Sequence, residues 1–211
     1  MSKKSILILF FIIGIIFVFM GRIVQVQLRH DIFTPQKSTF TFKSPERALQ
    51  GKVRASIGEV QKQPRDDDQL KKINVTEPVL QGDKIVTGKS AALTVQFADT
   101  GIVNIKGDSE VNVISLVSAN FLMQQVNGTV TYEALGNTPL SVRSMHVLFA
   151  LQSGIATVET DKDTSKVTLT LTGGKGKIAM IDINNDTHTW DLKAGQRAVI
   201  NDEEKTVKIT K

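Results

Sequence analysis

The sequence contains no cysteine, and this absence excludes several kinds of chemistry at once. Without a thiol there is no disulfide, no thiolate nucleophile and no cysteine-ligated zinc or iron–sulfur site. If the protein works in an oxidising compartment, its fold must therefore be stabilised by packing alone. Aromatic residues are also scarce, at 6% of the 211 residues, and ten of them are phenylalanine.

The sequence also lacks a cluster of basic residues, although its formal net charge is +5. The first thirty positions contain no acidic residue and four basic ones: Lys3, Lys4, Arg22 and Arg29. The rest of the chain carries 22 Lys and Arg against 21 Asp and Glu, so it is close to neutral. Binding to nucleic acid needs clustered cations that displace counterions from the phosphates. We therefore expect no nucleic-acid partner.

One long apolar run follows the basic start, from Ile6 to Met20 (ILILFFIIGIIFVFM). Thirteen of its residues are Ile, Leu, Val or Phe, so membrane insertion is favourable by several kcal/mol in total. Residues 5–21 would form a helix about 25 Å long, close to the ~30 Å hydrocarbon core of a bilayer. A cleaved signal peptide would need two small residues near its outer end, where Phe17 to Ile23 offers only Gly21. The run therefore predicts an uncleaved signal-anchor helix.

This anchor divides the chain into four predicted parts. Residues 1–4 form a short cytoplasmic tail, residues 5–21 the transmembrane signal-anchor helix, residues 22–50 a stalk or linker, and residues 51–211 an extracytoplasmic domain. The positive charges that flank the anchor nearly balance, so the predicted orientation rests on signal-anchor logic rather than on charge. We expect a single-pass membrane protein with the bulk of the chain extracytoplasmic, and a short strand at Thr39 to Phe42 in the stalk.

From Gly51 onward, apolar and polar residues alternate with a period of two, which is typical of strands with one buried face. Turn-forming residues separate these runs at Asp99-Thr100-Gly101, Lys106-Gly107-Asp108, Asn127-Gly128, Thr172-Gly173-Gly174 and Asn184-Asn185-Asp186. No stretch after the stalk has helical spacing, and the apolar run from His146 to Ser153 predicts a buried strand. The predicted fold class is therefore all-β, a short-strand β-solenoid-like or sandwich domain preceded by one N-terminal transmembrane helix.

The stretch from Leu80 to Gly101 resembles the core of the FecR domain family. That core reads approximately L-x-x-G-D-x-I-x-T-G, followed by a Ser-Ala-x-L strand and an F-x-D-G turn. The matching residues are Leu80-x-Gly82-Asp83-x-Ile85-x-Thr87-Gly88, Ser90-Ala91-Ala92-Leu93 and Phe97-Ala98-Asp99-Thr100-Gly101. This chain departs from the pattern by one missing residue between Leu80 and Gly82, and by Thr100 inside the Asp-Gly turn.

Shorter elements of the same family follow in order, so that the resemblance covers residues 51–200. They are Gly128-Thr129-Val130, Leu140-Ser141-Val142, Ser153-Gly154-Ile155-Ala156-Thr157-Val158, Gly176-Lys177-Ile178 and Leu192-Lys193-Ala194-Gly195-Gln196. Two departures are Gln125, where the family has Leu, and Thr138-Pro139, which precedes its strand. The resemblance implies an extracytoplasmic, solenoid-like β domain. The best-known members sense a transporter's state and relay it to a cytoplasmic anti-sigma segment. We expect no such segment before the anchor and do not carry over sigma-factor control.

Asp99-Thr100-Gly101 also matches the aspartic-protease signature. Two such carboxylates must share a proton, so a single copy would need a homodimer or a second lobe. Ile102 follows the motif where Ser, Thr or Ala is usual, and a hairpin turn explains the same residues.

Other weak motifs also favour turns over sites. Gly82 to Ser90 (GDKIVTGKS) imitates a phosphate-binding loop, but its glycines are one residue too far apart and a strand pattern follows instead of a helix. Asp161, Asp163 and Ser165 loosely resemble a calcium loop, yet Lys166 stands where glycine is needed. The remaining candidates are the exposed loop tip Asp66 to Asp68 and three histidines without metal-ligand spacing: His30, His146 and His188.

No set of residues in the sequence predicts catalysis, a metal site or a cofactor. We expect a membrane-anchored, non-catalytic FecR-like module of the cell envelope that binds another protein or senses a ligand. The membrane is contacted through Ile6 to Met20, and an envelope protein or other surface component is the expected partner. The alternatives are an aspartic-type envelope hydrolase using Asp99 and a structural spacer or assembly subunit. The oligomeric state, the partner and the strand order stay open.

Overall fold

The computed structural model describes residues 48–211, which consist of β-strands and the turns between them. The all-β prediction is confirmed for this part of the chain. Within it, no helix is long and apolar enough to cross a membrane. The anchor predicted at Ile6 to Met20, His30 and the strand predicted at Thr39 to Phe42 lie outside the described residues.

Fifteen strands follow one another along the described chain. They are β1 (Gly51–Ile57), β2 (Val60–Gln63), β3 (Lys71–Lys72), β4 (Pro78–Val79), β5 (Lys84–Thr87), β6 (Ala92–Phe97), β7 (Gly101–Ile105), β8 (Glu110–Val117), β9 (Asn120–Ala134), β10 (Leu140–Ser144), β11 (Val147–Asp161), β12 (Lys166–Ile181), β13 (Thr187–Lys193), β14 (Arg197–Asn201) and β15 (Thr206–Thr210). The run from His146 to Ser153 lies mostly in β11, as predicted.

The strands belong to one sheet that is folded into two facing layers. The front layer contains, in order, β4, β1, β6, β7, the second half of β9, the second half of β11, the first half of β12, β14 and β15. The back layer contains β3, β2, β5, β8, the first half of β9, β10, the first half of β11, the second half of β12 and β13. Only β9 and β10 pair in parallel among the described strands.

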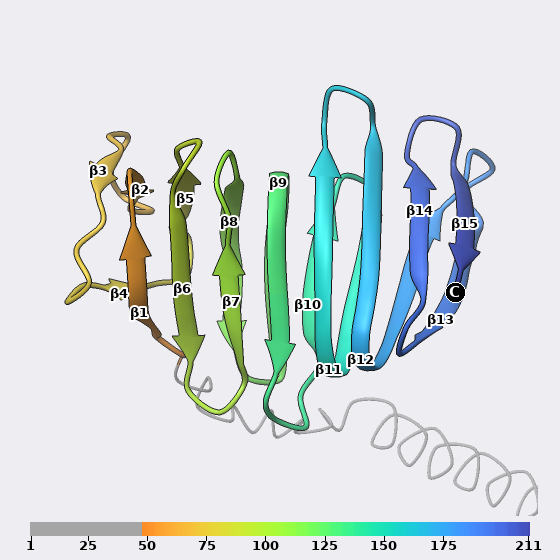
Figure 1. The fold of residues 1–211 in the computed structure, drawn as a ribbon, viewed down its shortest axis with the longest axis horizontal. Coiled ribbons are helices and arrows are strands. Elements are labelled where there is room, and N and C mark those ends of the chain that lie inside the picture. The colour runs from red at the N-terminus through yellow and green to blue at the C-terminus, as the bar shows by residue number, and fades with distance from the viewer. Residues whose placement is uncertain (1–47) are drawn as a thin grey trace, which may run out of the picture. The chain divides into compact units, whose positions relative to one another are not determined.

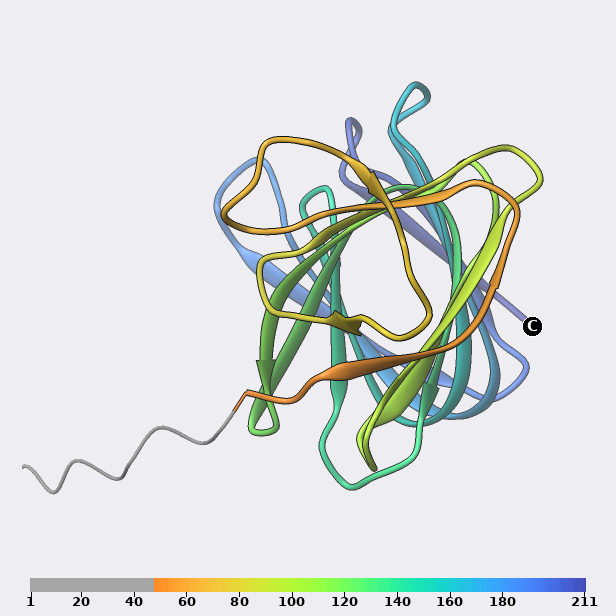
Figure 2. The same ribbon diagram turned by 90° about the vertical axis from the view of Figure 1, so that its left-hand side faces the viewer.

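The two layers enclose a single core along the length of the strand row. Figure 1 shows the strands side by side, from β1–β4 at one end to β13–β15 at the other, and Figure 2 looks along the row. In β6 the burial alternates strictly, with Leu93, Val95 and Phe97 buried. Phe97 meets Phe121 of the back layer edge to face, with ring centroids 5.1 Å apart. The alternation in the sequence therefore identifies the face of each layer that points into the core.

Three long strands pass from one layer to the other at glycines. β9 bends at Gly128, β11 at Gly154 and β12 at Gly174, and these residues have φ of 92°, 86° and 86°. The sequence predicts short strands that end at Asn127-Gly128 and at Thr172-Gly173-Gly174. This prediction is wrong, because β9 and β12 continue through both sites and reach 15 and 16 residues. A bend within a strand and a turn between strands both need the left-handed backbone conformation that glycine adopts without strain.

Gly154 and Gly174 lie opposite each other where the hairpin of β11 and β12 folds over. A Cβ atom on Gly174 would lie 1.9 Å from the carbonyl oxygen of Ser153, and one on Gly154 would lie 2.0 Å from that of Gly173. The strand register shifts on both sides of the pair. This corner therefore consists of two backbones that are too close together for any side chain.

Gln125, which replaces the Leu of the FecR pattern, is buried beside the bend of β9. Its side-chain amide donates to the carbonyl oxygens of Gly128 at 2.8 Å and Val158 at 3.0 Å, and its Oε1 accepts from the Tyr132 hydroxyl at 3.2 Å. Burial raises the pKa of Tyr132, so this hydroxyl stays protonated and donates. The departure from the family pattern is thus compensated by hydrogen bonds inside the core.

We predict that Gly174→Ala lowers the free energy of unfolding by more than about 2 kcal/mol, because it adds a backbone clash to the strain of a left-handed alanine. Gly173→Ala is the matched control, since a Cβ there meets nothing within 4 Å. Its effect should stay within about 1 kcal/mol. Urea unfolding of both variants measures the difference, and equal destabilisation by the two would contradict the corner described here.

Candidate functional site

The Gly82 to Ser90 stretch, which imitates a phosphate-binding loop, forms turns on either side of β5. Asp83 is buried, and its Oδ2 accepts the backbone N–H of Leu80 at 2.8 Å. The same oxygen lies 3.7 Å from Nζ of Lys62, which is buried and donates to the carbonyl oxygen of Pro78 at 3.0 Å. The turn prediction is confirmed, and Asp83 acts as a structural residue that closes the turn before β5.

Asp99 lies in the turn between β6 and β7, with an exposed side chain. The backbone N–H of Thr100 donates to the carbonyl oxygen of Phe97 at 2.9 Å and closes this turn. Within residues 48–211, no ion pair or side-chain hydrogen bond joins Asp99 to another residue. The structure therefore provides the predicted hairpin turn and no second carboxylate bound to Asp99.

The other candidate residues of the sequence also lie in turns or stay apart. Asp66 to Asp68 lies in the loop between β2 and β3. Asp161 accepts the Thr164 hydroxyl at 2.6 Å, and this hydrogen bond is the main reason why the pKa of Asp161 lies below its usual value. His146 lies in the turn between β10 and β11, whereas His188 lies in β13. In the described part of the chain, no three His, Asp or Glu side chains come close enough to hold a metal ion.

Both ends of the strand row leave strand edge unpaired, and they differ in the strands that provide it. The N-terminal end finishes in β3 and β4, which have two residues each, and β4 pairs only with Gly51 and Lys52 of β1. The C-terminal end finishes in β13 with seven residues and β15 with five, and each pairs with only one strand among the described residues. We call β13 and β15 together the C-terminal edge. Unpaired strand edges of this kind are templates for the addition of another strand.

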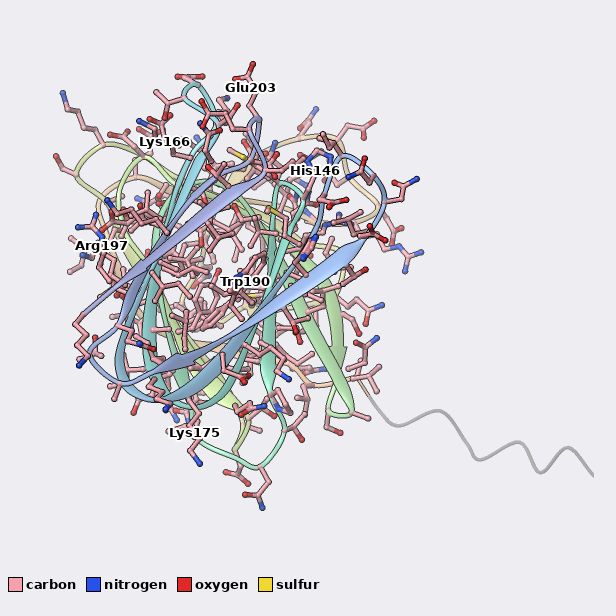
Figure 3. All side chains as sticks on the ribbon, turned by 90° about the vertical axis from the view of Figure 1, so that its right-hand side faces the viewer. His146, Lys166, Lys175, Trp190, Arg197 and Glu203 are labelled. Atoms are coloured by element: carbon pink, nitrogen blue, oxygen red, sulfur yellow. The ribbon has the colours of Figure 1, made fainter. Side chains whose placement is uncertain are left out.

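Trp190, the single tryptophan of the chain, lies at this C-terminal edge. Figure 3 looks onto this end and shows Trp190 between the ribbons of β13 and β15. The side chain is half-buried and packs against the core, as do Val207 and Ile209 of β15. The Trp190 ring lies 5.9 Å from that of His188. A half-exposed tryptophan beside apolar residues is typical of the centre of a binding interface.

A polar cluster ties two turns together at the same end of the domain. Nδ1 of His146, between β10 and β11, lies 2.8 Å from Oδ2 of Asp202, between β14 and β15. The backbone N–H of His146 and Nζ of Lys205 both donate to Oδ1 of Asp202, at 3.3 Å and 3.2 Å. Burial by itself raises the pKa of Asp202, but the hydrogen bonds from His146 and Lys205 outweigh it and hold the pKa below its usual value. The cluster holds the β14–β15 hairpin in place.

Comparison with solved structures supports the fold. The chain is similar to two crystal structures, at 2.50 Å and 1.65 Å resolution, of a protein from Parabacteroides distasonis ATCC 8503 that is described as a candidate anti-sigma factor. The identities are 13% and 12%, the TM-score is 0.53 for both, and each match covers 60% of this chain and 58% of that chain. No family model and no curated protein matches the sequence. These matches show a likeness of fold.

The sequence does not predict the C-terminal edge. The residues of β13 and β15 alternate like those of other strands, and alternation does not reveal whether a strand has one neighbour or two. Trp190 alone points to a binding surface there, because a single tryptophan near the end of a chain poor in aromatics is a candidate contact residue.

We predict that Asp83→Ala lowers the free energy of unfolding by about 1–3 kcal/mol, because it leaves the Leu80 N–H without its acceptor and leaves the buried Lys62 with only the more exposed Glu77, 3.4 Å away. Asp99→Ala, the matched control from the same FecR-like stretch, should change it by less than about 0.5 kcal/mol. Chemical denaturation of both variants measures the two effects. A larger effect at Asp99 than at Asp83 would show that the roles assigned to these carboxylates are wrong.

We predict that Asp202→Asn destabilises the domain at pH 7 and that this loss shrinks in acid. The pKa of Asp202 is lowered in the folded state, so its contribution is present above the unfolded value and disappears as the pH falls through the folded value. Urea unfolding of the wild type and the variant at pH 7 and pH 3 measures the difference. A constant difference at the two pH values would exclude an electrostatic role for the cluster.

Proposed function

We propose that this chain is a membrane-anchored, non-catalytic module whose extracytoplasmic β domain binds another protein of the cell envelope. The anchor at Ile6 to Met20 holds the chain in the membrane, with most of its residues outside the cytoplasm. The domain offers its C-terminal edge to the partner. The fold likeness to candidate anti-sigma factor structures supports an envelope-sensing role, and the role named for those proteins is not extended to this chain.

The unpaired C-terminal edge is the observation that carries this proposal. In β15, Val207 and Ile209 pack against the core, while Lys208 lies exposed between them. A strand added beside β15 would extend the front layer and gain backbone hydrogen bonds from its open side. It would also bury more of Trp190, which lies between β13 and β15 (Figure 3).

The edge also indicates the chemistry of the partner segment. An exposed lysine in an edge strand opposes indiscriminate strand pairing. An acidic residue opposite Lys208 on the added strand would form a favourable charge pair with it. We therefore infer an extended segment of alternating β-branched and polar residues, with an Asp or Glu opposite Lys208.

No specific observation favours either alternative function, the hydrolase or the spacer. A hydrolase using Asp99 needs a second carboxylate, and the turn that holds Asp99 does not bring one to it. In a spacer without a ligand, the unpaired sides of β13 and β15 would have no role.

Site-specific photo-crosslinking in intact cells tests the proposal. A photoreactive amino acid replaces Lys208 in β15 or Thr189 in β13, and replaces Lys52 as the control. Lys52 is exposed, but its strand β1 pairs with β4 on one side and β6 on the other. We expect one recurrent protein crosslinked from positions 208 and 189, at least fivefold more than from position 52, in the membrane fraction.

Equal yields from all three positions would overturn the assignment of the edge as the binding surface. Absence of a crosslinked protein at every position would favour the spacer. Recovery of the uncrosslinked full chain in the soluble fraction would contradict the anchor, independently of the edge.

A further inference from the structure

Two lysines face each other directly across β12 and β13. The register of these strands places Lys175 opposite Lys193, and Lys177 opposite Asp191. All four side chains are exposed, and they alternate with inward-facing residues such as Leu192. Lys177 and Asp191 form an ion pair at 3.6 Å. Like charges directly opposite in an antiparallel pair lower the stability of a sheet. The Lys175–Lys193 pair therefore costs stability unless an anion lies between the two ammonium groups.

Both lysines line one hollow at the surface, next to the corner of β12. Gln152 of β11 also lines this hollow. Asp191 is the one carboxylate in its lining, and Lys177 already neutralises it. Neither Lys175 nor Lys193 forms an ion pair with a carboxylate within residues 48–211. The hollow therefore has an excess of positive charge.

Glycines flank Lys175 on both sides, and its strand β12 pairs there with β11 on one side and β13 on the other. Gly174 has a positive φ, and a Cβ on Gly176 would lie 2.5 Å from the ring of Phe149. Neither position accepts a larger residue, so the neighbours of Lys175 in β12 add no side chain to the hollow. Figure 3 shows Lys175 at the lower rim of this end of the domain, projecting away from the core. A compact ligand can therefore approach the two exposed ammonium groups from the solvent side.

We propose that Lys175 and Lys193 form a binding site for a compact dianion of the phosphate class. Two ammonium groups match a phosphate monoester, which carries about −1.5 to −2 charge at pH 7. Lysine is a phosphate ligand that acts as a point charge and needs no bidentate geometry. A bound dianion turns the repulsive cross-strand pair into an attractive one. This site lies on the outer side of the back layer, so it requires neither the anchor nor the partner strand proposed above.

Thermal unfolding of the purified full-length protein in detergent tests this site. The fluorescence of Trp190 follows unfolding while inorganic phosphate is titrated against sodium chloride at constant ionic strength. A parallel titration with glycerol phosphate distinguishes free phosphate from a phosphate ester. Phosphate also stabilises proteins without binding to them, so only a saturable rise in the midpoint counts as binding. We expect such a rise for the wild type with one or both probes.

The double variant Lys175→Gln/Lys193→Gln should bind at least tenfold more weakly. The control Lys162→Gln/Lys166→Gln removes two exposed lysines at the turn between β11 and β12, outside the hollow, and its affinity should stay within twofold of the wild type. Lys193→Glu should raise the midpoint without phosphate, because it gives Lys175 an opposite charge, and should abolish the phosphate response.

Several results would overturn the site. They are the absence of a saturable response in the wild type, an equal response in both double variants, and a lower midpoint for Lys193→Glu than for the wild type without phosphate. None of them bears on the crosslinking outcome at Lys208, so failure of this site and failure of the proposed function are distinguishable.

Discussion

The close approach of two backbones at Gly154 and Gly174 is the constraint on which the two-layer architecture depends. β11 and β12 form the longest hairpin of the described chain, and each strand contributes one half to the front layer and one half to the back layer. β9 does the same through Gly128. Because the same strands build both layers, the layers cannot slide or separate without breaking hydrogen-bonded ladders. The domain should therefore unfold as one cooperative unit.

Buried hydroxyl groups complete the layer connection near the bend of β9. The Thr87 hydroxyl donates to the carbonyl oxygen of Lys106 at 2.6 Å, and the backbone N–H groups of Ser109 and Thr129 donate to the hydroxyls of Thr87 and Ser109. Within residues 48–211, no buried side-chain nitrogen or oxygen lacks a hydrogen-bond partner. The chain thus changes layer without leaving costly polar groups unpaired. Thr87 belongs to the FecR-like stretch, so part of that motif is explained by this hydrogen bonding.

The sequence predicts the strands well and their connections poorly. Alternation correctly identifies the buried side of β6, because a half-buried strand must place every second residue in the core. The sequence marks Gly128 and Gly174 as positions where the backbone can adopt a positive φ. Glycine does so both in a turn between strands and in a bend within a strand, so the sequence does not predict the long strands. The turns at Asp83 and Asp99 are also predicted. The sequence does not predict that Asp83 is buried beside Lys62, because the pairing of β2 with β5 brings these distant residues together. Similarly, Lys175 and Lys193 lie opposite each other because of the register of β12 and β13, which local composition does not encode.

The C-terminal end of the strand row leaves β13 and β15 unpaired on one side, and it holds the single tryptophan of the chain. Amide hydrogen exchange tests most directly whether this C-terminal edge meets a partner. The full-length protein would be compared in native membranes and in detergent, with β6 as an internal reference paired on both sides. The account predicts slower exchange in β13 or β15 in native membranes and unchanged exchange in β6. Equal exchange of β13 and β15 in both preparations would contradict it.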